Sequence, residues 1–358
     1  MGKSVTTSVL PHADPDRSRS ASASGRRVAR LSTFAVAMTA AFGVIAFYQP
    51  PRPLLRAPFT GSSNSLAVSM PHAELSANAF GRSGALQVRF ALPGQKVSYP
   101  LEVTGDPTAL YYVWQRVADS AIVDAPHTLG GDTLIAPDEA GFYHLAVVRD
   151  GLRRVIDGLT LAVLVPFERK RGPVLDGYRI GTYRAERDRS GERERPAGFV
   201  RVMPTEVELP VTKHLRLGDF LTRDGQATWP RYAAVSPRLL DKLELVLDLI
   251  SQWLGDSGHV QLLLNVHSGF RTPVYNRRVQ RAANDSRHQY GDAVDVAIDA
   301  NGDGRLTVRD VRIVAKAVEE VEQLYPDLVG GMGLYTSRRY SHPYVHIDAR
   351  GKRARWRG

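Results

Sequence analysis

A strand that carries a carboxylate into the protein interior is the feature that most limits how this chain can fold. Residues 293–298 read Ala-Val-Asp-Val-Ala-Ile, so the only charged side chain in the run is Asp295. A short apolar run of this kind predicts a buried strand. Burying an ionised carboxylate is costly unless a charged group pairs with it. The fold must therefore bring such a partner to Asp295.

Two histidines are placed to share that site. His288 stands in the pattern S-x-H-x-x-G-x-A-x-D over residues 286–295. Residues 344–348 read Tyr-Val-His-Ile-Asp and predict a second strand, with His346 and Asp348 on one face because side chains alternate. Two His and one Asp from neighbouring elements make a three-ligand zinc site with a fourth position left for water, the layout of a catalytic zinc.

The composition narrows the chemistry. The chain has 358 residues and no Cys, which excludes disulfides, thiolate metal sites and a cysteine nucleophile. This length predicts roughly two or three structural units. Lys and Arg total 47 against 37 Asp and Glu, a net charge of +10. Such a balance favours polyanionic neighbours, among them an acidic cell-wall polymer. Nucleic acid is not expected as a partner, because the N-terminus indicates export.

The N-terminal residues predict an anchoring segment. Residues 1–30 are basic and residues 31–48 contain no charge, a run just long enough to span a membrane, which takes ~20 residues. Because basic residues stay cytoplasmic, we expect a cytoplasmic tail over 1–30 and a transmembrane signal-anchor over 31–48. The protein would then be single-pass in the cytoplasmic membrane, with its catalytic domain on the periplasmic side. The alternative is a cleaved signal peptide. Residues 49–82, rich in Pro, Ser and Ala, predict a linker.

Residues 83–166 predict an all-β domain. Alternating runs such as LQVRFAL and FYHLAVV are separated by turn residues such as Pro93-Gly94. About seven strands of this kind suggest an immunoglobulin-like sandwich. Trp114 is placed to be its core tryptophan, and residues 137–143 resemble the turn before a tyrosine corner. The alternative is another small β-domain, and the fold alone indicates no chemistry.

The motifs of the C-terminal half together resemble a known family. They are Ser268 to Pro273 with Tyr275-Asn276, the pattern over 286–295, Gly331 to Tyr335, and Tyr344 to Asp348. In these residues the chain resembles the zinc D-Ala-D-Ala carboxypeptidase and endopeptidase family (peptidase family M15), in its YcbK-like murein endopeptidase branch. The similarity covers about residues 173–357.

The resemblance implies a fold and a function. Over residues 167–358 it implies an α+β domain of the LAS type, an antiparallel sheet with helices. The implied activity is a zinc metallopeptidase that cleaves peptidoglycan stem peptides or cross-links; which bond is cut stays open. The positions that match the family are zinc ligands His288, Asp295 and His346, the substrate-binding Arg271, and the pocket-lining Ser286 and Tyr290.

One departure concerns the general base, which accepts a proton from water during hydrolysis. Members of the family place a Glu three residues, or a His two residues, before the last zinc ligand. Here these positions hold Pro343 and Tyr344. The remaining candidates are Asp348, which could instead orient His346, and His342. The departure leaves a second hypothesis open, a peptidoglycan-binding protein that keeps the fold but has little or no activity.

Residues 299–310 match an EF-hand-like calcium loop. The pattern is D-x-N-x-D-G followed by a carboxylate at loop position 12, where Asp stands in place of the usual Glu. A helix is expected to follow it. The alternative is an acidic turn between a strand and a helix. The expected calcium ligands are Asp299, Asn301, Asp303, Arg305, Thr307 and Asp310.

Overall fold

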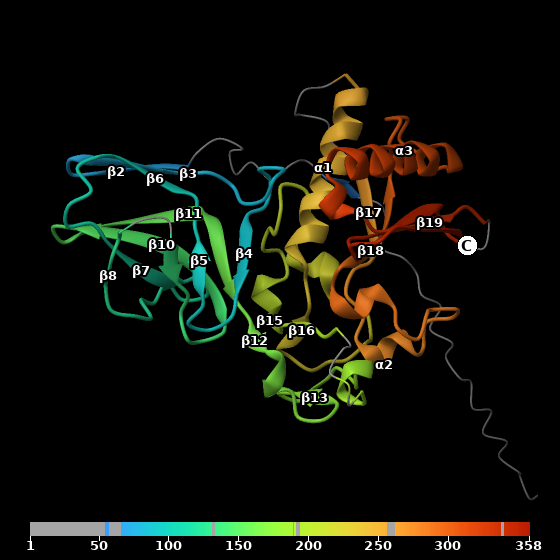
Figure 1. Ribbon diagram of the computed structural model, residues 1–358, viewed down its shortest axis with the longest axis horizontal. Helices are drawn as coiled ribbons and strands as arrows, with labels where there is room; N and C mark the ends of the chain where they lie inside the picture. Colours follow the sequence, from blue (N-terminus) through green and yellow to red (C-terminus); the bar gives the residue numbers. More distant parts are fainter. Residues whose placement is uncertain are drawn as a thin grey trace, which may run out of the picture. The chain divides into compact units, whose positions relative to one another are not determined.

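The computed structural model describes residues 54–56, 66–130, 133–188, 190, 194–255, 262–337 and 340–358. Residues 49–358 form one compact unit, which contains both expected domains, 83–166 and 167–358. Within this unit, the strands of residues 66–163, called the N-terminal part below, form sheets that are separate from the sheet that carries Asp295 (Figure 1).

The N-terminal part consists of three sheets. A five-stranded sheet has the order β4-β11-β10-β7-β8, with β4 parallel to β11 and the other pairs antiparallel. A three-stranded sheet has the order β2-β3-β6, and β5 pairs with β9. The strands are β2 (Leu66–Met70), β3 (Ala73–Ala77), β4 (Val88–Ala91), β5 (Lys96–Ser98), β6 (Leu101–Gly105), β7 (Tyr111–Arg116), β8 (His127–Thr128), β9 (Thr133–Ile135), β10 (Gly141–Arg149) and β11 (Leu152–Val163).

Two aromatic residues anchor this part as expected. Trp114 is fully buried, and its indole N–H donates to the carbonyl of Ile135 at 2.7 Å. The hydroxyl of Tyr143 donates to the carbonyl of Glu139 at 2.8 Å, four residues earlier in the chain. This bond confirms the predicted tyrosine-corner contact.

The expected linker over 49–82 contains three strands, β1 (Leu54–Arg56), β2 and β3. In β3 the side chains of Ala73, Leu75 and Ala77 are buried and alternate with less buried ones. This period-2 pattern lets β3 pair with β6 and cover a core. The high content of Pro, Ser and Ala in the neighbouring residues obscured the pattern.

Asp295 lies in a six-stranded sheet of the order β1-β17-β18-β20-β19-β21. All neighbours are antiparallel except β19 and β21. The strands are β1 (Leu54–Arg56), β17 (Leu262–Ser268), β18 (Ala293–Ile298), β19 (Gly331–Tyr335), β20 (Tyr344–Asp348) and β21 (Ala354–Arg357). Thus β18, predicted as a buried strand, is internal to the sheet and paired on both sides.

Two long helices cover one face of this sheet. Helix α1 (Pro237–Trp253) packs against α3 (Val308–Leu324), and α3 contacts β18, β19 and β20 (Figure 1). Pro237 at the start of α1 and the capping box of Thr307 and Asp310 at the start of α3 fix where the helices begin. A helix was expected after the loop over residues 299–310, and α3 confirms it.

Short elements make up the rest of the C-terminal half. Strands β12, β15 and β16 form a sheet, and β13 pairs with β14. Their bounds are β12 (Val165–Pro166), β13 (Val174–Leu175), β14 (Tyr178–Arg179), β15 (Gly198–Val202) and β16 (Arg231–Ala233). The short helices are η1 (Phe167–Arg169), η2 (Arg184–Glu186), η3 (Pro204–Glu206), η4 (Leu217–Phe220), α2 (Pro273–Asn276), η5 (Arg287–Tyr290) and η6 (Pro326–Leu328).

The expected fold class needs correction, both for the α+β domain and for the transmembrane helix before it. Strands predominate over helices in the described residues, of which 21% are helical. The long stretch before α1 folds into short strands and single helical turns instead of further helices. Its sequence is interrupted by Gly, Pro and charged residues, which break helical periodicity.

The single-pass localisation is also corrected. In the part of the chain that the structure describes, no helix is both long and apolar enough to cross a membrane. The basic tail over 1–30 and the signal-anchor over 31–48 lie outside the described residues.

A carboxylate of α1 joins the two parts of the unit. Asp241 accepts hydrogen bonds from the backbone N–H groups of Arg82 at 3.0 Å and Ser83 at 2.8 Å. Gly81 precedes them with a φ of +82°, and a Cβ there would lie 2.7 Å from Asp241 Oδ1. Only a glycine lets the chain approach the helix this closely.

A buried ion pair lies where α1 and α3 meet the end of β20. The Lys242 ammonium of α1 is fully buried and donates to Glu322 Oε1 at 2.7 Å and to the carbonyl of Asp348 at 2.8 Å. Glu322 also accepts from the backbone of Gly330 at 3.0 Å and pairs with Arg355. Burial lowers the pKa of Lys242, and Glu322 opposes that effect. The network connects α1, α3 and the end of β20.

We predict that Lys242→Met destabilises the protein by about 3–5 kcal/mol, because it leaves the Glu322 carboxylate buried without its ammonium partner. The free energy of unfolding is measured by urea titration. Lys352→Met, at an exposed position, is the control and should change stability by less than ~0.5 kcal/mol. Equal stabilities of the two variants would contradict a structural role for this ion pair.

Candidate metal centre

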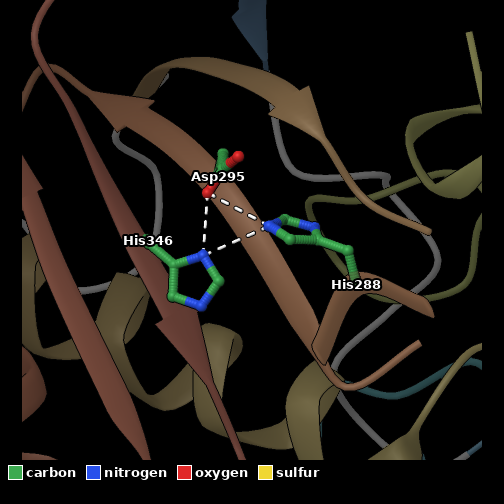
Figure 2. Close-up of side chains that lie close together, drawn as sticks. All are labelled: His288, Asp295 and His346. Atoms are coloured by element: carbon green, nitrogen blue, oxygen red, sulfur yellow. Dashed lines mark hydrogen bonds and ion pairs between the residues drawn. The ribbon is translucent and has the colours of Figure 1, made fainter. Parts of the chain in front are cut away.

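His288, Asp295 and His346 come together on one side of the six-stranded sheet. One ligand atom from each lies within 4.8 Å of the other two, and all three residues are buried. Asp295 Oδ1 is 2.9 Å from His346 Nδ1 and 3.3 Å from His288 Nε2, and the two ring nitrogens are 3.2 Å apart. Figure 2 shows these three atoms pointing toward one another. The predicted metal-binding group is therefore assembled in the structure.

Strand register and one tight turn bring the three side chains together. Asp295 of β18 pairs directly with His346 of β20. His288 comes from η5. Gly291 follows the last residue of η5 and has a left-handed backbone conformation, with a φ of +74°. A Cβ on Gly291 would lie 2.2 Å from the carbonyl oxygen of Ala234. This glycine therefore allows the chain to turn from His288 into β18, as expected.

Hydrogen bonds hold both imidazoles in the tautomers that metal binding needs. His288 Nδ1 lies 2.7 Å from the carbonyl oxygen of Gly269, which can only accept, so Nδ1 carries the proton. His346 Nε2 lies 3.2 Å from Asp348 Oδ2 and donates to this carboxylate. The other nitrogens, His288 Nε2 and His346 Nδ1, therefore face Asp295 and are the atoms that a metal ion would bind. Acceptors behind the ligands are typical of metal-bound histidines.

The charges around the group also suit a cation. Burial, aided by the charge of Arg271, lowers the pKa of His288 to about 4, so this ring is neutral. Burial would raise the pKa of Asp295, but the interactions with His288 and Arg271 and the hydrogen bond with His346 outweigh it and hold the pKa well below its usual range. Burial would lower the pKa of His346, but the hydrogen bonds to Asp295 and Asp348 outweigh it. Without a metal, a proton is favoured on His346, and a metal ion would replace that proton.

Arg271 contacts a metal ligand directly. Its Nε donates to Ser268 Oγ at 2.7 Å, and its guanidinium forms an ion pair with Asp295 Oδ2. Asp295 thus presents Oδ1 to the histidines while Arg271 holds Oδ2. The substrate-binding role expected of Arg271 stays a prediction.

The carboxylate of Asp348 is fully engaged. Oδ1 accepts from Gly331 N at 2.7 Å and from Arg350 Nε at 2.9 Å, and Oδ2 accepts from the Arg350 guanidinium and from His346. Burial would raise the pKa of Asp348, but the bonds from His346 and Arg350 outweigh it and hold the pKa far below its usual value. An anion in this state is a poor proton acceptor. Of the two roles left open for Asp348, the geometry favours orienting His346.

The other expected site residues lie near the group but differ in their contacts. His342 is half-buried in the loop before β20. Ser286 is buried at the start of η5. The hydroxyl of Tyr290 donates to Asp285 Oδ1 at 2.5 Å, and its ring lies under the guanidinium of Arg287. Substrate binding by Ser286 and Tyr290 stays a prediction.

Two neighbours of the group were missed by the sequence analysis. The ring of Trp356 in β21 lies 5.0 Å from that of His346, centroid to centroid. His267 of β17 is buried, and its ring lies 4.9 Å from that of Tyr344. The sequence signal for His267 was a single imidazole in the otherwise apolar strand LLLNVHS.

The expected calcium loop forms a closed turn. Asp299 accepts from Gly304 N at 2.7 Å, which places Gly304 over the start of the loop. Asp310 accepts from Thr307 N at 2.8 Å and from Ala300 N at 3.0 Å. Within the described residues, the loop carboxylates do not converge as the three metal-centre ligands do. The helix expected after the loop is α3.

Comparisons with protein-family models, with curated proteins and with solved structures found no match to this chain. The resemblance to the zinc peptidase family therefore rests on the sequence motifs.

We predict that Asp348→Asn weakens metal binding about 10–100-fold, because it disturbs the acceptor that orients His346. Zn²⁺ is the probe, and its affinity is measured by competition with a chelating dye. Glu102→Gln, on the exposed side of β6, is the control and should bind as the wild type does. An unchanged affinity in Asp348→Asn would show that His346 does not need this carboxylate.

Proposed function

We propose that this protein is a zinc-dependent peptidase that hydrolyses peptide bonds in peptidoglycan stem peptides or cross-links. The observation that carries the proposal is the convergence of two imidazole nitrogens and one carboxylate oxygen in a buried group. Catalytic zinc sites use three protein ligands of these types. The motif resemblance over residues 173–357 adds the substrate class.

The residues of the group fit zinc by their chemistry. His288 Nε2, Asp295 Oδ1 and His346 Nδ1 would hold the ion, and each imidazole has its second nitrogen on an acceptor. Zinc bound there supplies a Lewis acid that polarises the scissile carbonyl and acidifies water. Because the chain has no Cys, no thiolate competes for the metal.

Residues around the ligands would keep the site rigid during the reaction. The carbonyl of Gly269 fixes the ring of His288, and Asp348 with Arg350 fixes that of His346. Arg271 neutralises the second oxygen of Asp295, and its position beside the ligand would let it receive a substrate carbonyl or carboxylate. Fixed donors of this kind need no reorganisation when charge develops on the substrate.

The net charge of +10 supports a polyanionic target. A cell wall presents negative charge together with the peptide bonds that the site would cleave. The charge alone does not distinguish among peptidoglycan bonds, so the cleaved bond is an outcome of the test below.

One observation favours a second candidate function. Both oxygens of Asp348 are engaged, and Pro343 and Tyr344 occupy the positions where the family has its base. A chain that lacks a proton acceptor would bind peptidoglycan without cleaving it. This alternative is a peptidoglycan-binding protein that retains the metal site.

We predict that the zinc-loaded protein releases new amino and carboxyl termini from purified muropeptides, identified by mass spectrometry. His346→Ala should lose both bound zinc and turnover, because it removes one of three ligands. Tyr111→Phe, at an exposed position in β7, is the control. Binding of muropeptides without new termini under any metal condition would favour the alternative, and neither binding nor cleavage would contradict both.

We also propose that the loop over residues 299–310 binds Ca²⁺. Its expected ligands alternate along a loop that already has the turn at Gly304. Asp299 directly follows β18, so an ion in the loop would hold the end of the strand that carries Asp295.

We predict that millimolar Ca²⁺ raises the melting temperature of the wild type and not that of Asp303→Ala. Peptidase activity should fall when calcium is removed by a chelator that leaves zinc bound, since small misplacements of catalytic groups cost up to ~10²-fold in rate. Asp138→Ala, an exposed aspartate of the N-terminal part, is the control. A melting temperature and an activity that do not respond to calcium would mean that the loop is an ordinary turn.

A further inference from the structure

The proposed hydrolysis needs a group that accepts a proton from water and returns it to the leaving amine. Asp348 is engaged in orienting His346, and Pro343 and Tyr344 offer no base at the expected positions. His267 of β17 is a buried imidazole close to the metal group, and no other role has been assigned to it.

His267 lies at a β-bulge, on the face of the sheet that carries Asp295. In the pairing of β17 with β18, Val266 lies opposite Val296 and Ser268 lies opposite Asp295, so His267 is the extra residue between them. Bulges redirect a side chain and are common beside active sites. Val266 pairs with Val296, which faces the helices, so alternation places His267 on the opposite face, that of Asp295, and the bulge brings Ser268 opposite Asp295.

The contact with Tyr344 places the ring on the face of the metal ligands. The centroids of the two rings are 4.9 Å apart, although β18 lies between β17 and β20 in the sheet. The imidazole therefore reaches across β18, where Ala297 carries only a methyl group. Tyr344 precedes His346 by two residues and shares its face. His267 thus comes to the position beside Tyr344 from a different strand.

The surroundings of His267 suit a proton acceptor. The residue is 6% exposed, the same as the ligands Asp295 and His346. Burial lowers the pKa of His267 to about 4; Asp295 opposes this shift, and the charges of His342 and Arg223 contribute to it. The imidazole is therefore neutral near pH 7, and the Asp295 carboxylate would stabilise the cation formed when it takes a proton.

We infer that His267 is the general base of the proposed peptidase, an inference that rests on the proposed function. As the oxygen of a water molecule bonds to the scissile carbonyl carbon, one of its protons passes to a ring nitrogen of His267. The carbon–nitrogen bond then breaks, and the same proton moves to the departing amine nitrogen. The other product is a carboxylic acid, which releases its proton to solvent.

The decisive variant is His267→Gln, which keeps a polar side chain of similar length but cannot exchange a proton near pH 7. In the zinc-loaded variant, kcat on a defined muropeptide should fall about 10²–10⁴-fold, with KM within about threefold of the wild type and zinc content unchanged. His127→Gln is the matched control, because His127 also lies against a tyrosine ring, that of Tyr112, in the N-terminal part. It should retain wild-type kcat.

A second variant protects the test against a structural effect of the substitution. His267→Ala leaves space for a small molecule, so added imidazole should restore part of the lost kcat, and imidazoles of different pKa should restore different fractions. Loss of zinc from both variants without rescue would mean that His267 supports the fold instead of the chemistry, and would overturn the inference.

Two further outcomes separate the inference from the proposed function. Wild-type turnover together with a kcat of His267→Gln within threefold of the wild type refutes the role of His267 alone. A large loss of kcat in His342→Gln but not in His267→Gln assigns the base to His342. A zinc-loaded wild type that cleaves no muropeptide refutes the proposed function and the role of His267 with it.

Discussion

The burial of the Asp295 carboxylate is the constraint on which the C-terminal half depends. An ionised carboxylate inside a sheet is stable only when charged and hydrogen-bonding partners surround it. Arg271 holds one oxygen, and His288 and His346 approach the other. These partners come from separate segments of the chain, and Gly291 allows one of those segments to turn sharply into β18. The group that satisfies the carboxylate is the same group that can hold a metal.

The two faces of the central strands divide structure from chemistry. Val294, Val296 and Ile347 are buried, and α3 packs against their strands. Asp295 and His346 alternate with them and meet on the other face. The Lys242–Glu322 pair reaches the backbone carbonyl of Asp348, so the helices fix the end of the strand whose side chains orient His346. Packing of α1 and α3 therefore contributes to the geometry of the metal centre without touching it.

The sequence allowed the metal ligands to be predicted because their signals are local. Asp295 interrupts an apolar run, and His346 follows the alternation of a strand. The turn before Tyr143 and the helix after residues 299–310 were accessible for the same reason. The contact between His267 and Tyr344 was not, because it joins two strands that lie far apart in the sequence. The hydrogen bonding of the Asp348 carboxylate was also not accessible, because one of its donors is Gly331 in another strand. The α+β class was wrong, because the segment between η1 and α1 folds into short strands and single helical turns.

The most direct test of the account is the zinc X-ray absorption spectrum of the metal-loaded protein. The account predicts one zinc per chain with two imidazoles and further oxygen ligands at about 2.0–2.2 Å. In Asp295→Ala the imidazole contribution should weaken and zinc occupancy should fall. A spectrum without imidazole scattering, or one that is identical in wild type and Asp295→Ala, would contradict the assignment of His288, Asp295 and His346 as the metal centre.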